Sequence, residues 1–216
     1  MLQHFQQIDD NSFENILLYL DFEDQLSLRL LDKKLNQRCL MVWRRVRSLE
    51  LKYTEEKKLS KNMINYIIDL RKGPHSFTYE IFRFMRNLTT LVIDHNTMFM
   101  RLSLRDRECS SDIVLRALKG CPKVNSLSCI GVPLTRQIFA RLMIKRRLRN
   151  FCFDTVKEDA VTLVYKLLEC SMFLINLSIP QFVTVSDNMH LSAVVRVWDV
   201  PTISVCLREW NVGGLG

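Results

Sequence analysis

The chain of 216 residues is poor in the residues that break regular structure, with 6 glycines and 5 prolines. This composition excludes a linker-like or disordered chain, so most of the length is expected to fold. No apolar stretch approaches the roughly 18 residues that cross a bilayer, and the N-terminus lacks the basic start and apolar run of a secretory signal. The sequence therefore predicts a soluble intracellular protein, cytoplasmic or nuclear, with no membrane association.

The sequence also lacks the motifs that carry chemistry. The 7 cysteines are scattered without a C-x-x-C pair, which predicts reduced thiols packed as small apolar side chains rather than disulfides or a zinc site. The 4 histidines are isolated, and the glycines form no phosphate-binding loop. No serine or cysteine lies in a nucleophile motif. We therefore expect no catalytic residue, no metal and no cofactor: the protein is not an enzyme but acts by binding.

What the chain does have is a globular composition, 48% apolar and 25% charged, with a net charge of +8 that favours acidic partners. Its densest basic run, Arg141–Arg149, has two interpretations. It is a patch for nucleic acid or acidic peptide, or it is the end of a helix whose cations complement the helix dipole. The second is favoured, because no aromatic residue interleaves the run as a single-strand-binding platform requires.

The first fifty residues predict short helices. Ser12 is a candidate N-cap for a helix with apolar residues at helical spacing from Phe13 to Leu20, and Asp24 is a candidate N-cap for a second. The second helix has leucines on more than one stripe, so a neighbour or another chain must bury them. A third helix is expected to turn these arginines to water: Arg38, Arg44, Arg45 and Arg47. Three helices in about 40 residues form only a small core, so we expect a partner to stabilise them. The alternative is that these helices are the start of a larger helical domain.

These residues resemble an F-box. The family's Leu-Pro falls on Ile8-Asp9, its Ile-Phe-x-Tyr-Leu on 16–20, its Asp-Leu-Leu-x-Leu on 24–28, its Val-Cys-Lys-x-Trp on 31–35 and its later Leu-Trp on 42–43. The register holds without a gap from position 8 to position 35. The chain departs from the pattern where the family has proline, glutamate and leucine, at Asp9, Asn11 and Gln25. Losing the proline and some apolar contact is expected to weaken partner binding about tenfold.

Later segments repeat one template, in which apolar residues are separated by two residues and then by one. They span 88–93, 124–129, 148–153 and 174–179, and their starts lie 36, 24 and 26 residues apart. Two of these intervals lie in the 20–29-residue range of leucine-rich repeats. A helical pattern precedes each segment, at 77–85, 113–118, 137–144 and 161–168, and residues 96–111 are expected to form an inserted loop. Weaker strands are predicted at 48–51 and 203–207, the latter after a helix at 191–198.

Residues Ala117–Val124 resemble the helix end and Cys-Pro turn of the leucine-rich repeats found in F-box proteins. Together the two resemblances imply an α/β chain. Residues 1–47 would form a three-helix F-box, and residues 48–216 a short right-handed leucine-rich-repeat solenoid whose parallel strands line the concave face. Such units bury their apolar faces only when stacked. The chain ends without a closing helix or polar cap, which indicates an atypical or truncated last unit.

The resemblance implies a substrate-recognition adaptor of an SCF (cullin–RING) E3 ubiquitin ligase, whose F-box binds the Skp-type adaptor and whose repeats bind an unidentified target protein. The residues assigned to the F-box core and adaptor contact are Ile8, Ile16, Leu17, Leu20, Leu26, Leu28, Leu31, Leu35 and Trp43. The strand residues expected to face outward and bind the target are Thr90, Val92, Asp94, Ser126, Ser128, Ile130, Asn150, Cys152, Asp154, Asn176, Ser178 and Pro180.

Two other functions stay open on the sequence. One is a leucine-rich-repeat interaction module whose F-box has decayed and has no ligase role, which the residues at positions 9 and 11 favour. The other is a basic nucleic-acid-binding protein that uses Arg141–Arg149, for which a steep loss of affinity with salt would be diagnostic.

Overall fold

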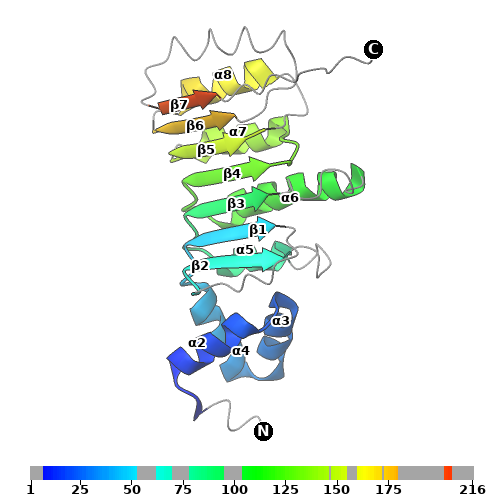
Figure 1. Ribbon diagram of the computed structural model, residues 1–216, viewed down its shortest axis with the longest axis vertical. Helices are drawn as coiled ribbons and strands as arrows, with labels where there is room; N and C mark the ends of the chain where they lie inside the picture. The colour runs from blue at the N-terminus through cyan, green and yellow to red at the C-terminus, as the bar shows by residue number, and fades with distance from the viewer. Residues whose placement is uncertain are drawn as a thin grey trace, which may run out of the picture.

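In the computed structural model, the described residues are 7–52, 62–69, 78–94, 104–145, 147–154, 160–171, 173–179 and 202–205. Helices α2 (Asp10–Tyr19), α3 (Phe22–Leu31) and α4 (Lys33–Trp43) form a helical module at the N-terminal end. The module lies against one end of a parallel sheet (Figure 1). The fold is therefore α/β, as the sequence predicts.

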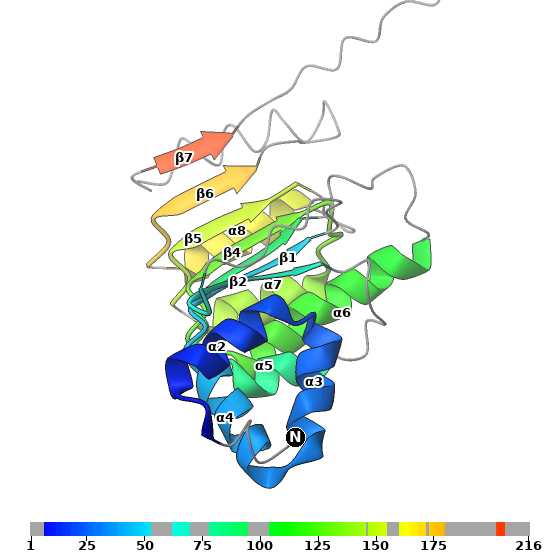
Figure 2. The ribbon, with the colours of Figure 1, turned by 60° about the horizontal axis from the view of Figure 1, so that its bottom comes forward.

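The sheet and the helices behind it form a stack. Among the described residues the sheet has seven strands in the order β2-β1-β3-β4-β5-β6-β7, and every neighbouring pair is parallel. Figures 1 and 2 show helices α5 to α8 on one face of this sheet. The strands are β1 Ser48–Lys52, β2 Asn65–Asp69, β3 Thr90–Asp94, β4 Ser126–Ile130, β5 Asn150–Phe153, β6 Asn176–Ile179 and β7 Thr202–Val205. The helices are α5 Thr78–Phe84, α6 Leu104–Gly120, α7 Arg136–Lys145 and α8 Ala160–Cys170.

The strands predicted from the template are confirmed, as are the weaker first and last ones. The sequence did not predict β2, which lies outside β1 at the edge next to the helical module, so the first three strands are not stacked in chain order. Helix α6 begins at Leu104, so the prediction of a loop over 104–111 is wrong. Residues 96–103 and the predicted helix at 191–198 lie outside the described residues.

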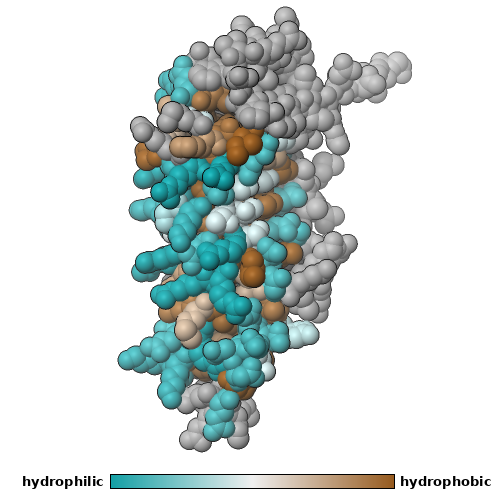
Figure 3. Space-filling view, turned by 90° about the vertical axis from the view of Figure 1, so that its left-hand side faces the viewer, coloured by the Kyte–Doolittle hydropathy of each residue, from teal (hydrophilic) through white to brown (hydrophobic). Residues whose placement is uncertain are grey.

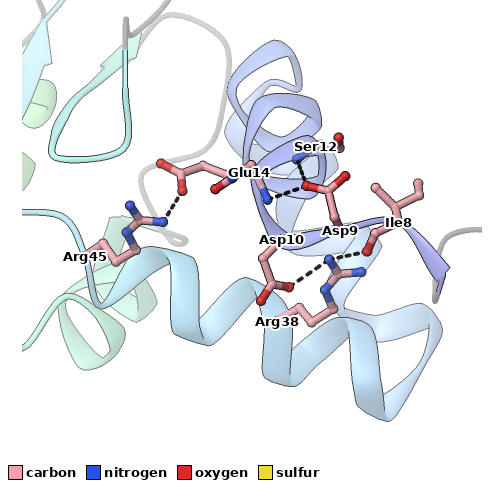
Figure 4. A network of polar contacts seen from close by, with 8 residues as sticks. Ile8, Asp9, Asp10, Ser12, Glu14, Arg38 and Arg45 are labelled. Atoms are coloured by element: carbon pink, nitrogen blue, oxygen red, sulfur yellow. Dashed lines mark hydrogen bonds and ion pairs between the residues drawn. The ribbon is translucent and has the colours of Figure 1, made fainter.

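The N-caps of the first two helices differ from the prediction. Asp9, not Ser12, caps α2, because its Oδ1 accepts hydrogen bonds from the backbone N–H groups of Asn11 and Ser12, both at 3.0 Å (Figure 4). The hydrogen bonds from Ser12 lower the pKa of the Asp9 carboxyl. The N-cap of α3 is Asp21, and Asp24 lies in the first turn, where its charge complements the helix dipole. The position where the family has proline thus holds a capping residue.

Two arginines of the third predicted helix contact α2. The Arg38 guanidinium lies 4.2 Å from the ring centroid of Phe13, donates to the carbonyl of Ile8 at 2.8 Å and pairs with Asp10 at 2.9 Å (Figure 4). Just beyond α4, another arginine forms an ion pair with α2: Arg45 with Glu14. The prediction that all four arginines face water is therefore wrong for Arg38, whose side chain is 13% exposed. The remaining two are exposed: Arg44 and Arg47.

A buried amide joins the helical module to the sheet. Gln25 is fully buried, and its Nε2 donates to the carbonyls of Leu17 at 2.6 Å and Leu20 at 3.1 Å. The same Nε2 lies 2.5 Å from the hydroxyl of Tyr66 on β2, and Oε1 accepts from Trp43 Nε1 at 2.9 Å. Burial raises the pKa of Tyr66, so the hydroxyl stays protonated. This network connects all three helices of the module to the edge strand β2.

Aromatic packing continues the same junction. The Trp43 ring lies 5.5 Å from that of Phe22 and 5.6 Å from that of Phe84 on α5. The Arg29 guanidinium lies 4.9 Å from the centroid of the Phe84 ring, which adds a cation–π contact between α3 and the stack. One apolar cluster runs from Phe13 in the module to Leu177 in β6. The boundary at residue 47 stays a prediction, and the core is continuous across it.

We predict that Gln25→Leu, which restores the leucine of the F-box pattern, destabilises the protein by about 2–4 kcal/mol. The substitution leaves the Trp43 indole N–H and the Tyr66 hydroxyl buried without their partner. Urea denaturation measures the change in unfolding free energy. Tyr66→Phe, which removes only the hydroxyl, serves as the control and should cost about 1 kcal/mol. A Gln25→Leu variant as stable as the parent would show that the network contributes nothing.

Candidate protein-interaction surfaces

The structure separates core from surface among the nine residues assigned to the predicted F-box. Leu17, Leu35 and Trp43 are fully buried, so they pack the module and offer no side-chain surface to a partner. Leu31 is 62% exposed. The other five are half-buried, between the core and the surface: Ile8, Ile16, Leu20, Leu26 and Leu28.

Helix α3 turns one leucine-bearing face outward. Phe22 and Gln25 face the core, and the opposite side begins with exposed acidic residues and ends with Leu30, 77% exposed, and Leu31. The prediction chose only Leu31 of these two leucines. Helical spacing from the inward positions 22 and 25 places both on the outer side. The other large exposed apolar side chains on described residues of the module are Tyr19 and Met41.

The sheet face opposite the helices, here the open face, carries the predicted target-binding residues. Burial alternates along β1, β3 and β4, with the inner residues buried and the outer ones half-buried. The register aligns the outer residues in rows across the strands. One row is Thr90, Ser126, Asn150 and Asn176, the next is Val92, Ser128, Cys152 and Ser178, and the third is Asp94 and Ile130. These ten residues therefore lie on one face, as predicted.

The open face also extends over β1, whose outward residues the predicted target-binding set did not include. The register of β1 with β3 aligns Ser48, Glu50 and Lys52 with the three rows, and Lys52 forms an ion pair of 2.6 Å with Glu50. At the other end, Asn176 Nδ2 donates to Asn150 Oδ1 at 2.6 Å. The open face consists mainly of polar side chains, some of which are joined by an ion pair or a hydrogen bond, with isolated apolar residues between them.

Asp154 does not belong to the open face. It is buried at 6% exposure, and both of its carboxylate oxygens lie 2.9 Å from the N–H of Gly131. Gly131 has a φ of 71°, a left-handed conformation that favours glycine. Through these hydrogen bonds Asp154 fixes the turn that follows β4. It leaves the open face because β5 ends one residue earlier, at Phe153. Pro180, the last residue of the predicted set, lies outside the described residues.

The basic run Arg141–Arg149 is divided by the structure. Arg141 is exposed on α7, whereas Lys145 at the helix end turns inward and donates to the carbonyl of Cys121 at 2.5 Å. Burial lowers the pKa of Lys145 to about 8. Arg147 and Arg149 are exposed beyond the helix. The described cations of the run therefore do not form one exposed patch. Lys145 is hydrogen-bonded at the C-terminal end of α7, where a cation complements the helix dipole.

The described cysteines are free thiols, as predicted. Cys39, Cys121 and Cys129 are buried, whereas Cys152 is half-buried and Cys170 is exposed. Burial raises the pKa of Cys39 to about 11 and that of Cys121 to about 12, so these thiols are unreactive at neutral pH.

Within the part of the chain that the structure describes, no group of three or more histidine, cysteine, aspartate or glutamate residues could hold a metal ion. No described helix is both long and apolar enough to pass through a membrane. No protein-family model matches the chain, and no curated protein matches it.

We predict that iodoacetamide modifies Cys152 and Cys170 in the folded protein and spares Cys129. Cys129 and Cys152 lie on neighbouring strands, and the register places the first inside the stack and the second on the open face. Mass spectrometry of the alkylated peptides measures each site, and the same reaction in urea gives the control in which all sites react. Equal labelling of Cys129 and Cys152 in the folded protein would contradict the strand register.

Proposed function

We propose that this protein is a substrate-recognition adaptor of an SCF (cullin–RING) E3 ubiquitin ligase. The helical module would act as an F-box and bind the Skp-type adaptor, and the stack would act as a short right-handed leucine-rich-repeat solenoid that holds a target protein. The adaptor would do no chemistry itself. It would raise the effective concentration of the target beside the ubiquitin-charged enzyme.

The observation that carries the proposal is the leucine pair on the outer face of α3. Leu30 and Leu31 are 77% and 62% exposed, although the helix already buries Phe22 against the core. Fully burying a leucine contributes about 1.5–3 kcal/mol, so a partner that covers this pair would gain substantially. Both leucines lie within the segment that resembles an F-box, where such a partner is expected.

The rigid junction between module and stack also supports the proposal. Gln25 and Trp43 connect the module to β2 and α5 through buried contacts. An adaptor that delivers a target to a distant enzyme needs a fixed geometry between its two binding surfaces. The open face lies on the sheet, whereas the leucine pair lies on a helix of the module, so one chain can present both surfaces at once.

A second candidate function is an interaction module without a ligase role. Two residues that depart from the F-box pattern favour this function, because both stabilise the fold. Asp9 caps α2, and Gln25 hydrogen-bonds to residues of the module and of β2. In this case the module would serve as the end cap of the stack. The open face would still bind a protein.

Co-expression with a Skp-type adaptor separates the two functions. We predict a stable complex for the parent chain and at least tenfold weaker binding for Leu30→Asp/Leu31→Asp, because the charged side chains would be buried against the partner. Thermal unfolding should show that the double variant stays folded with a modest loss of stability, because two aspartates in the last turn of α3 oppose the helix dipole. Titration calorimetry measures the affinity.

The control is Ile144→Asp, which places one aspartate at a 72% exposed apolar position on α7. This variant should bind the adaptor like the parent chain. If the parent forms no complex, or if the double variant binds as well as the control, the ligase function is rejected and the interaction module is favoured.

A further inference from the structure

The turns that lead from a helix into the next strand lie along one edge of the stack. Because the strands are parallel and β1, β3, β4 and β5 are successive neighbours, their starting ends form a row. Six cations in the described parts of these turns are exposed, and together they define the turn edge: Arg44, Arg47, Arg86, Lys123, Arg147 and Arg149. Arg45 is also exposed but pairs with Glu14. Figure 3, which views the side where the strands begin, shows hydrophilic surface over the middle of the stack.

A backbone ladder holds the turn edge in register. The carbonyl of the residue before one strand accepts two hydrogen bonds, at 2.7–3.1 Å, from consecutive N–H groups at the start of the next. The accepting residues of the successive turns are Arg47, Thr89, Asn125 and Arg149. Neighbouring strands lie about 4.8 Å apart, so the row from Arg47 to Arg149 is about 14 Å long. This length matches about four or five residues of an extended polypeptide.

Asn87 brings two of the cations together. Its Oδ1 accepts from Lys123 Nζ at 2.7 Å, its carbonyl accepts from the Arg47 guanidinium at 3.1 Å, and its Nδ2 donates to the carbonyl of Arg44 at 3.0 Å. The two cations are thus held by neutral acceptors, and neither forms an ion pair with another described residue. Their charges are oriented, and no described carboxylate compensates them, which favours an anionic ligand.

Apolar side chains flank the cations at both ends of the row. Ile175, 43% exposed, follows Arg149 in the ladder, and Phe173, two residues earlier in the sequence, is 55% exposed. At the opposite end Ile64, 46% exposed, precedes β2 and accepts from the N–H of Arg47. The turn edge is therefore a short basic row between apolar ends.

We propose that the turn edge binds an acidic segment of a protein partner, with an apolar residue of that segment packed on Phe173 and Ile175. The site is separate from the open face and from the leucine pair of α3. Its occupancy does not depend on whether the helical module binds an adaptor.

A polypeptide fits this edge better than a nucleic acid. The four turns contain no aromatic side chain, and Phe173 at the end of the row is one ring, too few for successive bases to stack on. Exposed isoleucines next to the cations offer nothing to phosphates or bases, but they suit aliphatic or aromatic side chains of a peptide. The row of about 14 Å is also short for the phosphate track that gives a duplex its affinity.

Fluorescence anisotropy with three labelled probes tests the proposal on the full chain. The first probe is a peptide of six glutamates followed by Trp-Leu, the second ends in Ser-Ser instead, and the third is an oligothymidylate of equal charge. We expect the first peptide to bind several-fold more tightly than the second, because only the first has an apolar end. The oligonucleotide should bind most weakly.

Two triple variants locate the site. Arg47→Glu/Lys123→Glu/Arg149→Glu should weaken binding of the first peptide by about tenfold, since three exposed charge pairs are reversed. Lys33→Glu/Arg141→Glu/Lys166→Glu reverses three exposed cations elsewhere and changes the net charge equally, so it should weaken binding by less than about threefold. Phe173→Ser/Ile175→Ser should remove only the advantage of the Trp-Leu end. Circular dichroism and thermal unfolding confirm that each variant is folded.

Three results would overturn the proposal. Equal losses in the two triple variants would mean that only net charge attracts the peptide. Tighter binding of the oligonucleotide would identify the edge as a nucleic-acid site. No measurable binding of the first peptide at low salt would show that the edge has no acidic polypeptide ligand.

Discussion

The side-chain amide of Gln25 is the interaction on which the arrangement of the protein depends. It lies where three helices meet the edge strand of the sheet, and it connects Leu17, Trp43 and Tyr66 through buried hydrogen bonds. A buried polar group without partners is costly, so the helices and β2 must keep the geometry that supplies them. Leucine at this position would fill the space without specifying the angle between the module and the stack. The amide fixes that angle, and with it the relative positions of every surface described above.

The surfaces differ in chemistry because each arises from a different part of the repeating unit. The strands contribute small polar side chains to the open face, where alternate residues point away from the core. The turns contribute cations, which lie beyond the helix ends and follow one another along the backbone ladder. Helix α3 contributes leucines, since the module lies at the end of the stack and no other described element covers the outer side of this helix. A single core therefore supports three surfaces of different chemistry.

The sequence predicts the stack well, because the template recurs and each strand repeats the same inward spacing. Strand β2 follows the same spacing, with buried Met63, Tyr66 and Ile68 at the three template positions. It escaped prediction because methionine and tyrosine stand there in place of the leucine-like residues of the other segments. The sequence could not separate the buried leucines of the module from the exposed ones. Leu17 and Leu31 differ only in whether their side of the helix packs against the core, which the local pattern does not reveal. Asp154 was misplaced for a related reason: its strand ends one residue early, so the alternation no longer applies. The partners of Gln25 depend on the distant Tyr66, which local patterns do not reveal.

Hydrogen exchange of the chain, alone and with a Skp-type adaptor, tests most directly the claim that the module and the open face are separate surfaces on one body. Amide protection reports which backbone segments a partner stabilises. The account predicts added protection confined to α2–α4, greatest toward the end of α3, with the amides of β3 to β5 unchanged. Protection that spreads along the sheet strands, or that leaves α3 unaffected while the complex forms, would contradict it.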